Sequence, residues 1–195
     1  MIEHKNYKFQ CSLSLRQLNM IIRSVNQGDL DRLYLNYKTY YKEYKENLEF
    51  GKLMFEPDCD SHTRWFSKLM SWLNSGDAVA FVASTGNDIV GFCQIKRNIQ
   101  DWSNHIGTLG ISITKDYRGM GIGKKLIINS IAASKGIFEI ISLDVISSNI
   151  AAISLYKKIG FDIYGIAPRF IKRSETYRDL YLMYLNVNSF KFVQE

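Results

Sequence analysis

Hydrophobic residues in the first part of the chain recur at two spacings, and each spacing predicts its own kind of element. A short apolar run at residues 18–25 predicts a strand. Residues 29–46 and 61–73 carry apolar side chains at helical spacing and predict two helices. We expect Gly28 or Asp29 to cap the first helix and Ser75–Gly76 to end the second.

From residue 78 onward the apolar runs become shorter and richer in β-branched residues. Three such runs separated by polar turns predict an antiparallel meander. A glycine-rich turn then opens a helix that ends near Gly136, and Asn149 with the serines before it provides caps for a shorter helix closed by Gly160. The elements expected here are 78–83, 89–95, 106–113, the helix 122–135, a buried strand 140–146, the helix up to 159, and a hairpin of 161–171 with 177–185.

Length and composition fit one compact α/β (α+β) domain that covers residues 1–195. The chain is 46% hydrophobic, has two prolines, and shows no linker or internal repeat. It contains no run of about 18 apolar residues and no apolar signal-peptide region, so we expect a cytoplasmic protein without membrane contact. Its three cysteines lie far apart, which predicts neither a disulfide framework nor a metal site.

The stretch ISITKDYRGMGIGKK, residues 111–125, combines a β-branched run with alternate glycines and basic residues. Without Cβ atoms, the glycines let backbone N–H groups approach a bulky anion closely. Lysines stand in the first turn of the following helix, although the helix dipole favours acidic residues there. The pattern indicates a strand that leads into a phosphate-binding turn. The glycines are Gly119, Gly121 and Gly123, and the basic residues are Arg118, Lys124 and Lys125.

Spacing separates the phosphate-binding motifs that contain such a turn. A Walker A loop would require Gly at Arg118 and Ser or Thr at Lys125. A dinucleotide-binding fingerprint would require Gly at Lys124 or at Leu126. Both motifs are excluded, whereas the pattern R-x-x-G-x-G is satisfied from Arg118 to Gly123.

In this pattern the sequence resembles the GNAT superfamily of CoA-dependent N-acetyltransferases. Residues 111–126 look like that family's strand, pyrophosphate loop and helix. The stretch NIAAISLYKKIGF, residues 149–161, looks like its second signature, N-x-x-A-x-x-L-Y-x-x-x-G-F. The resemblance implies the GNAT fold, a central mixed, mostly antiparallel sheet of about seven strands flanked by about four helices. It also implies acetyl-CoA as cosubstrate and no metal.

The resemblance further implies roles for individual residues. Backbone N–H groups between Arg118 and Lys124 would bind the pyrophosphate, and the strand before them would pair with the pantetheine arm. Tyr156 matches the family's general acid, because a pKa of about 10 keeps it protonated at neutral pH; the alternatives are a packed aromatic for Tyr156 and a helix cap for Asn149. The implied CoA-binding residues are Ile111, Ser112, Ile113, Arg118, Gly119, Met120, Gly121, Ile122, Gly123, Lys124, Asn149 and Tyr156.

The general base has no obvious counterpart, because Thr108 stands where many relatives carry a Glu. His105 is a candidate since its pKa suits neutral pH, and a chain of water molecules is an alternative. A missing carboxylate favours an α-amine or another weakly basic amine as the acceptor, since the pKa of an α-amine is about 7.7–8.0 against about 10.4 for a lysine side chain. By resemblance the acceptor site lies between the first two helices and the last hairpin, with Tyr34, Tyr37 and Tyr177 as candidate contacts; tyrosines at helical spacing are also typical of core packing.

The formal net charge of +6 lies mainly in residues 81–195, which carry fourteen Lys/Arg against nine Asp/Glu. This suits a small anionic ligand, and since no block of consecutive basic residues is present we expect no nucleic-acid partner. We therefore expect an enzyme, monomeric or homodimeric, that moves an acetyl group from acetyl-CoA directly to a primary amine of a small molecule or protein N-terminus in a ternary complex. The alternatives are a catalytically silent CoA-binding module of the same fold and a basic nucleic-acid-binding domain.

Overall fold

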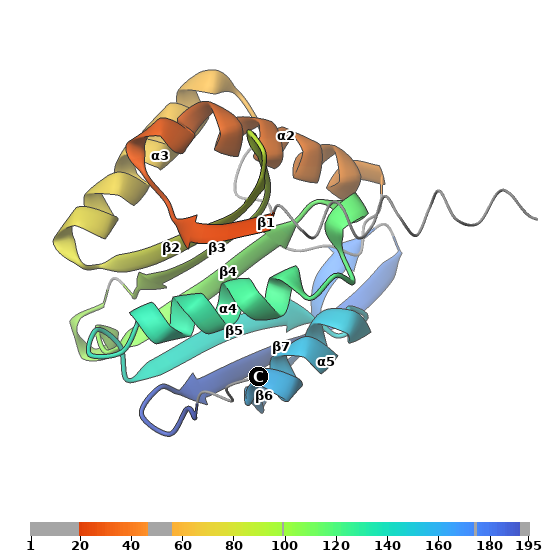
Figure 1. The fold of residues 1–195 in the computed structure, drawn as a ribbon. Coiled ribbons are helices and arrows are strands. Elements are labelled where there is room, and N and C mark those ends of the chain that lie inside the picture. Colours follow the sequence, from red (N-terminus) through yellow and green to blue (C-terminus); the bar gives the residue numbers. More distant parts are fainter. Residues whose placement is uncertain (1–19, 47–55, 99, 174, 192–195) are drawn as a thin grey trace, which may run out of the picture.

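The computed structural model describes residues 20–46, 56–98, 100–173 and 175–191, and it contains one seven-stranded sheet. The strand order is β1-β2-β3-β4-β5-β7-β6. Four α-helices lie in the described residues, so the predicted mixed sheet with four helices is confirmed. The elements are β1 Met20–Ser24, α2 Leu30–Glu46, α3 Cys59–Ser75, β2 Ala78–Thr85, β3 Asp88–Arg97, β4 Ile106–Ile113, α4 Ile122–Ala133, β5 Ile140–Ile146, α5 Ile150–Ile159, β6 Asp162–Arg173 and β7 Thr176–Asn186 (Figure 1).

The sheet is antiparallel except where β4 lies beside β5. Strands β2 to β4 form the predicted antiparallel meander, β1 pairs antiparallel with β2, and β5, β7 and β6 are also joined antiparallel. Strands β4 and β5 run parallel and pair only at Ile106, Gly107 and Thr108 of β4 with residues 140–142 of β5. The sheet therefore consists of two antiparallel parts joined by a short parallel contact.

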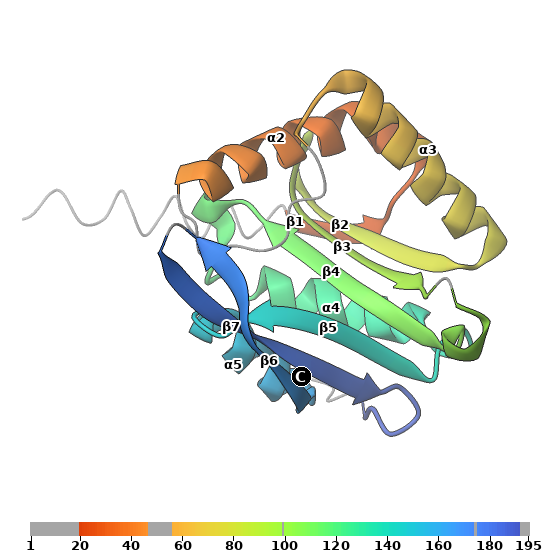
Figure 2. The same cartoon turned by 180° about the vertical axis from the view of Figure 1, so that it is seen from behind.

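Two hydrophobic clusters lie on opposite faces of the sheet. On one face, α4 and α5 pack on a cluster that includes Cys93, Ile127 and Leu143 (Figure 1). On the other face, α2 and α3 pack on a cluster that includes Phe66 and Phe92. Seen from behind, α2 and α3 lie toward the β1–β3 side, and none of the described helices covers β5 and β7 on this face (Figure 2). We call this uncovered side the open face of the sheet.

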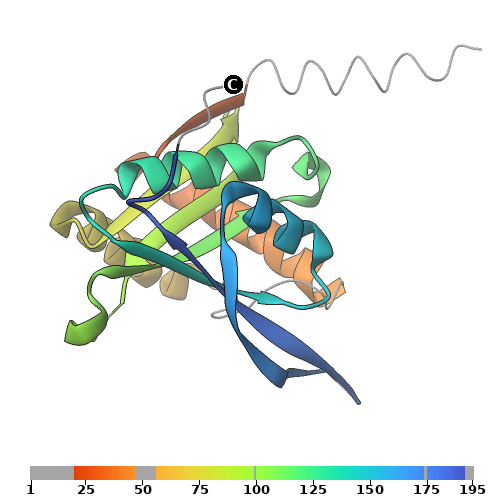
Figure 3. The same ribbon diagram turned by 90° about the horizontal axis from the view of Figure 1, so that it is seen from below.

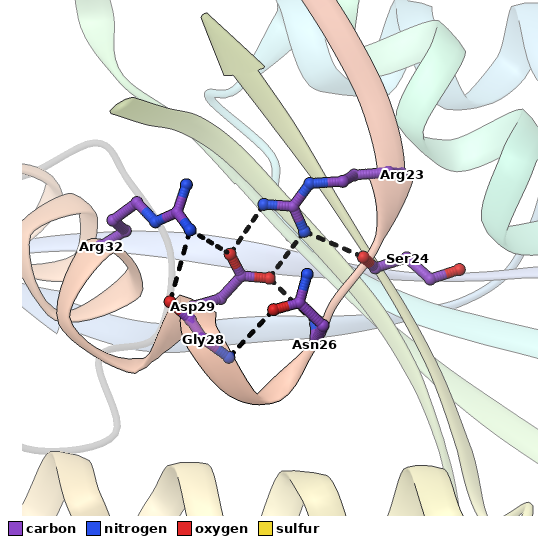
Figure 4. A network of polar contacts seen from close by, with 6 residues as sticks. All are labelled: Arg23, Ser24, Asn26, Gly28, Asp29 and Arg32. Carbon is purple, nitrogen blue, oxygen red and sulfur yellow. Dashed lines mark hydrogen bonds and ion pairs between the residues drawn. The ribbon is translucent and has the colours of Figure 1, made fainter. Parts of the chain in front are cut away.

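A buried carboxylate holds the turn between β1 and α2 (Figure 4). Asp29 is fully buried and accepts two hydrogen bonds of 2.7 Å from the Arg23 guanidinium and one of 2.9 Å from the backbone N–H of Asn26. Burial acts to raise the pKa of Asp29, but the hydrogen bonds from Arg23 and Asn26 outweigh it and the pKa lies below its ordinary value. Asn26 caps a short 3-10 turn that precedes α2, so the predicted cap at Gly28 or Asp29 was wrong by one helical turn.

Of the other predicted helix ends, those at Gly76, Asn149 and Gly160 are confirmed. Helix α3 begins at Cys59, two residues before the predicted start, and α4 ends at Ala133 with Ser134 as its C-cap, before the predicted Gly136. Asp58 caps α3, and Gly76 ends it in the left-handed conformation. Asn149 caps α5, and Gly160 ends it in the same way. None of the described helices is both long and apolar enough to cross a membrane.

Strands β6 and β7 form the predicted hairpin, which extends beyond the rest of the sheet (Figure 3). The backbone of Arg169 in β6 has a φ of 55°, a left-handed conformation that is unfavourable for an arginine. Its backbone N–H donates to the Asp179 carboxylate of β7 at 2.8 Å, which helps to hold this conformation. The hairpin is thus shaped by a side chain as well as by its strand pairing.

Candidate active site

Strands β4 and β5 diverge beyond their three paired residues. Residues 109–113 of β4 continue to pair with β3, and residues 143–146 of β5 continue to pair with β7. Within the described residues, the edges of β4 and β5 that face each other there have no strand partner. A free strand edge can pair with an extended ligand through its N–H and C=O groups. The half-buried Ile111, Ser112 and Ile113, predicted to meet the pantetheine arm, lie along this edge.

Three glycines shape the loop after β4 for two different reasons. Gly119 and Gly121 have φ values of 75° and 77°, and a Cβ atom on either would point into open space. Gly123 is buried in the first turn of α4, where a Cβ atom would come within 3.1 Å of Leu155 and 3.2 Å of Ile113. The first two glycines therefore set the path of the loop and leave its outer side open, and the third lets α4 pack closely.

The loop, residues 118–124, leads into a helix N-terminus without acidic residues; we call it the donor loop. Gly121 is the cap of α4, and no side chain of the described residues bonds to its N-terminal N–H groups as a cap. Such N–H groups carry partial positive charge and bind anions. Lys124 and Lys125 add positive charge in the same turn. The arrangement suits a diphosphate, in line with the sequence prediction.

The side chain of Arg118 contacts α2 and β4. Its guanidinium pairs with Glu43 of α2, and its Nε donates to the carbonyl of Ile113 at 2.9 Å. The third positive charge that the sequence predicts beside the anion is therefore balanced by a carboxylate. The neighbouring Met120 and Ile122 pack in the core cluster and anchor the loop.

Tyr156 of α5 belongs to the core cluster beneath the sheet. It is 7% exposed, and its ring meets that of Phe161 edge-on at 5.9 Å. Burial raises the pKa of Tyr156, and the charges of Cys93, Tyr40 and Asp144 raise it further. The hydroxyl therefore stays protonated at neutral pH. The packed-aromatic alternative is therefore realised for its ring, and the role of its hydroxyl as general acid stays a prediction.

Asn149 occupies the start of α5. Its Oδ1 accepts a hydrogen bond from the backbone N–H of Ala152 at 3.2 Å, so the helix-cap alternative is realised. A contact between Asn149 and CoA stays a prediction.

Asp144 of β5 is an acidic residue that the sequence analysis did not assign to the site. It is exposed, whereas its neighbours Leu143 and Val145 are buried in the cluster on the α4–α5 side. Because side chains alternate along a strand, Asp144 points to the open face of the sheet. It lies two residues beyond Ser142, the last β5 residue paired with β4, and its charge acts on Tyr156. A charged residue inside an otherwise apolar strand was the sequence feature that identifies it.

Two positions were considered for the general base. His105 lies just before β4, and Thr108 carries a hydroxyl in place of a carboxylate. His105 precedes β4, whereas the donor loop follows its other end; the 8 residues of β4 span about 26 Å. Thr108 donates its hydroxyl to the side-chain oxygen of Asn98 at 2.8 Å. The structure therefore brings neither a carboxylate of β4 nor His105 to the donor loop.

Aromatic side chains of α2 and α3 gather around His62. The His62 ring lies 5.0 Å from that of Tyr34, 6.3 Å from that of Tyr37 and 5.1 Å from that of Trp65. His62 is 2% exposed and its Nε2–H donates to the Leu30 carbonyl at 3.3 Å, while its Nδ1 has no hydrogen-bond partner among the described residues. Burial lowers the pKa of His62, which keeps the ring neutral. We call His62, Tyr34, Tyr37 and Trp65 the aromatic cluster.

Tyr177, the third tyrosine predicted to contact the acceptor, lies on the hairpin. The Arg169 guanidinium stacks over its ring at 4.0 Å, and the Lys172 ammonium lies 5.6 Å from the ring centre. The structure thus brings Tyr34 and Tyr37 together in the aromatic cluster and gives Tyr177 basic neighbours of its own.

Comparison with known proteins identifies the family. Residues 37–161 match the profile of the acetyltransferase (GNAT) family, which is more than half of the chain. The protein therefore belongs to the GNAT family, as its two sequence motifs predict.

Named relatives and a solved structure agree with this assignment. The chain is 29% identical to an L-amino acid N-acetyltransferase of Escherichia coli over 104 residues, covering 52% of this chain and 64% of the relative, less than two thirds of its length. It is 33% identical to an N-alpha-acetyltransferase of Sulfurisphaera tokodaii over 122 residues, covering 57% of this chain and 71% of the relative. A protein from Salmonella typhimurium, solved with its cofactor acetyl-CoA, shares the fold with a TM-score of 0.74 at 17% identity, covering 88% of this chain and 95% of the other.

Proposed function

We propose that this protein transfers the acetyl group of acetyl-CoA to a primary amine of a small molecule or a protein N-terminus. The observation that carries the proposal is the donor loop, which follows the free edge of β4 where β4 and β5 diverge. Tyr156, on the helix that follows β5, stays protonated because burial raises its pKa. Membership of the GNAT acetyltransferase family supports the same activity.

In the proposed complex, acetyl-CoA lies along the free edge of β4. Its diphosphate accepts hydrogen bonds from the N–H groups of the donor loop and of the N-terminus of α4, which meet the charge without protein rearrangement. Its pantetheine amides pair with residues 111–113 of β4 as an added strand would. This path leads the thioester toward Tyr156, and a backbone N–H of β4 polarises its carbonyl.

Transfer is direct, within a ternary complex. The neutral amine nitrogen attacks the thioester carbonyl carbon, the C–S bond breaks, and the departing thiolate takes the hydroxyl proton of Tyr156. Burial disfavours the phenolate of Tyr156, and it disfavours the departing thiolate in the same apolar surroundings, so the thiolate is a stronger base there than in water. The phenolate regains a proton from solvent before the next turnover. The second proton, which the nitrogen loses, leaves toward the open face.

Asp144 is the group that we propose to receive the second proton, directly or through water. It points to the open face, two residues beyond the last β4–β5 pair, on the side where an amine can approach. A carboxylate is a weak base, so it suits an α-amine, whose pKa of about 7.7–8.0 gives a far larger neutral fraction at neutral pH than the pKa of about 10.4 of a lysine side chain does. This favours an α-amine over a lysine side chain as the acceptor.

The two named relatives support an α-amine acceptor but differ in its kind. One is named for free L-amino acids and the other for N-alpha-acetylation. An aromatic cluster on α2 and α3, with the buried Nδ1 of His62 as an unused acceptor, offers an apolar wall for either kind.

A two-part assay tests the proposal. Acetyl-CoA should raise the melting temperature, because a ligand that binds only the folded state stabilises it. Release of free CoA thiol should then follow with at least one member of a panel of L-amino acids, N-terminal peptides and polyamines. Stabilisation without thiol release from any amine would indicate a silent CoA-binding module, and the absence of both effects would refute the proposal.

A further inference from the structure

One carboxylate joins α2 to the segment that leads into the donor loop. Glu43 accepts a hydrogen bond from the backbone N–H of Lys115 at 2.9 Å through Oε1, and it pairs with the Arg118 guanidinium through Oε2. Arg118 in turn donates from Nε to the Ile113 carbonyl at 2.9 Å. Glu43 is 72 residues from Lys115 and 75 from Arg118 along the chain, so this contact exists only in the folded protein.

These bonds hold three residues of the segment that precedes Gly119. Ile113 is the last residue of β4, Lys115 begins a short 3-10 turn, and Arg118 directly precedes Gly119. Gly119 and Gly121 have no conformational preference of their own, and nothing packs where their Cβ atoms would be. The direction of the loop N–H groups is therefore set by what holds the residues before them.

The contact is sheltered enough to be specific. The Glu43 side chain is 16% exposed and that of Arg118 is 29% exposed. Both carboxylate oxygens are used, and a hydrogen bond between charged groups is stronger than one between neutral groups. Such a contact holds a chosen geometry better than an exposed ion pair does.

We propose that Glu43 is a positioning residue of the acetyl-CoA site: it holds Lys115 and Arg118 so that the N–H groups of the donor loop face the diphosphate. Arg118 thereby acts through Glu43 and β4, and its charge is not the main attraction for the ligand. This inference rests on the proposed function, since it assumes that acetyl-CoA is the ligand.

The sign of the effect separates positioning from simple electrostatics. A carboxylate near a diphosphate repels it, so removing the charge of Glu43 should tighten binding if only the charge matters. If Glu43 positions the loop, removing it should weaken binding. A contact that only stabilises the fold would lower the melting temperature and leave affinity unchanged for protein that is still folded.

The experiment compares the dissociation constants of wild type, Glu43→Gln and Asp116→Asn for acetyl-CoA by calorimetry, at a temperature where circular dichroism shows all three folded. Gln has nearly the same shape as Glu but no charge. Glu43→Gln should therefore weaken acetyl-CoA binding about tenfold, the change in affinity that corresponds to the loss of one charge-assisted hydrogen bond. Asp116→Asn is the matched control, since Asp116 is an exposed acid in the same 3-10 turn. It should leave affinity within about twofold of wild type or tighten it.

A second probe, S-acetyl-pantetheine, lacks the diphosphate and should bind wild type and Glu43→Gln equally. Equal or tighter acetyl-CoA binding by Glu43→Gln would overturn the inference, as would an equal loss of affinity for both probes. Failure of the wild type to bind acetyl-CoA would instead refute the proposed function, so the two failures are distinguishable.

Discussion

The proposed donor side and acceptor side of this protein use different groups of the chain: mainly backbone on the donor side and side chains on the acceptor side. On the donor side the surface is mainly backbone: the left-handed glycines of the donor loop, the N-terminus of α4 and the free edge of β4. On the proposed acceptor side, α2 and α3 carry an aromatic cluster that includes Tyr37, His62 and Trp65.

The difference follows from what each substrate offers for recognition. A diphosphate and an amide-containing arm can be bound by N–H and C=O groups that every residue carries, so the sequence has only to set the path of the chain. An amine is common to many molecules, and its carrier can be distinguished only by side chains that fit the rest of it. A donor site can therefore be recognised from local spacing, and an acceptor site cannot.

Loss of the Tyr156 hydroxyl should give the largest effect and should separate chemistry from donor binding. Tyr156→Phe keeps the packed ring and removes the proton donor, so we expect kcat to fall about 100-fold with little change in acetyl-CoA affinity. Steady-state thiol release and calorimetry measure the two quantities. Tyr164→Phe is the control, because Tyr164 is 60% exposed on β6 and should leave kcat unchanged. Unaltered turnover in Tyr156→Phe would rule out the acid role.

Gly121→Ala tests whether the backbone conformation of the donor loop forms the binding surface for acetyl-CoA. Gly121 has a φ of 77° and Gly136, in the turn after α4, has a φ of 79°; a Cβ atom on either would meet open space. Each alanine should cost about 1–2 kcal/mol of stability by the same strain. Only Gly121→Ala should also weaken acetyl-CoA binding, as measured by calorimetry. Equal affinities of the two variants would show that the donor loop does not form the binding surface.

The smallest expected effect concerns the acceptor side and depends on pH. Burial lowers the pKa of His62, so the folded protein binds a proton less readily than the unfolded chain. Stability should therefore be complete above the unfolded pKa of about 6.5 and fall as the pH drops below it, by at most about 1.4 kcal/mol per pH unit. Urea unfolding at pH 7.5 and 5.5 measures this loss.

The matched variant is His62→Gln, which keeps a donor for the Leu30 carbonyl and removes the titrating ring. It should lose less stability between the two pH values than wild type does, because it lacks the group whose pKa burial lowers. Identical pH dependence in wild type and His62→Gln would show that the aromatic cluster does not control this titration.

The sequence predicted the order of the elements and the donor motifs, because both depend on residues that lie close together in the chain. Helix spacing, the capping residue Asn149 and the glycines of the turn before α4 all act within a few residues. The first cap was misplaced because Asp29 bonds back to Asn26 and extends the helical segment by a 3-10 turn.

The features that the sequence did not predict depend on contacts between distant parts of the chain. The partner of Arg118 is 75 residues away in α2, and no local pattern links the two. Asp144 can be assigned to the open face only after the pairing of β5 is known. The buried environment of His62 likewise depends on how α2 and α3 pack.

The brief pairing of β4 with β5 has a mechanical consequence. In the described part of the chain, strand pairing between the two antiparallel parts of the sheet is limited to three residue pairs, and beyond Thr108 the ladder of backbone hydrogen bonds is interrupted. A donor bound along β4 would restore part of that ladder from outside the chain. The substrate would then serve as a temporary eighth strand beside β4. Each turnover would end this pairing when CoA is released.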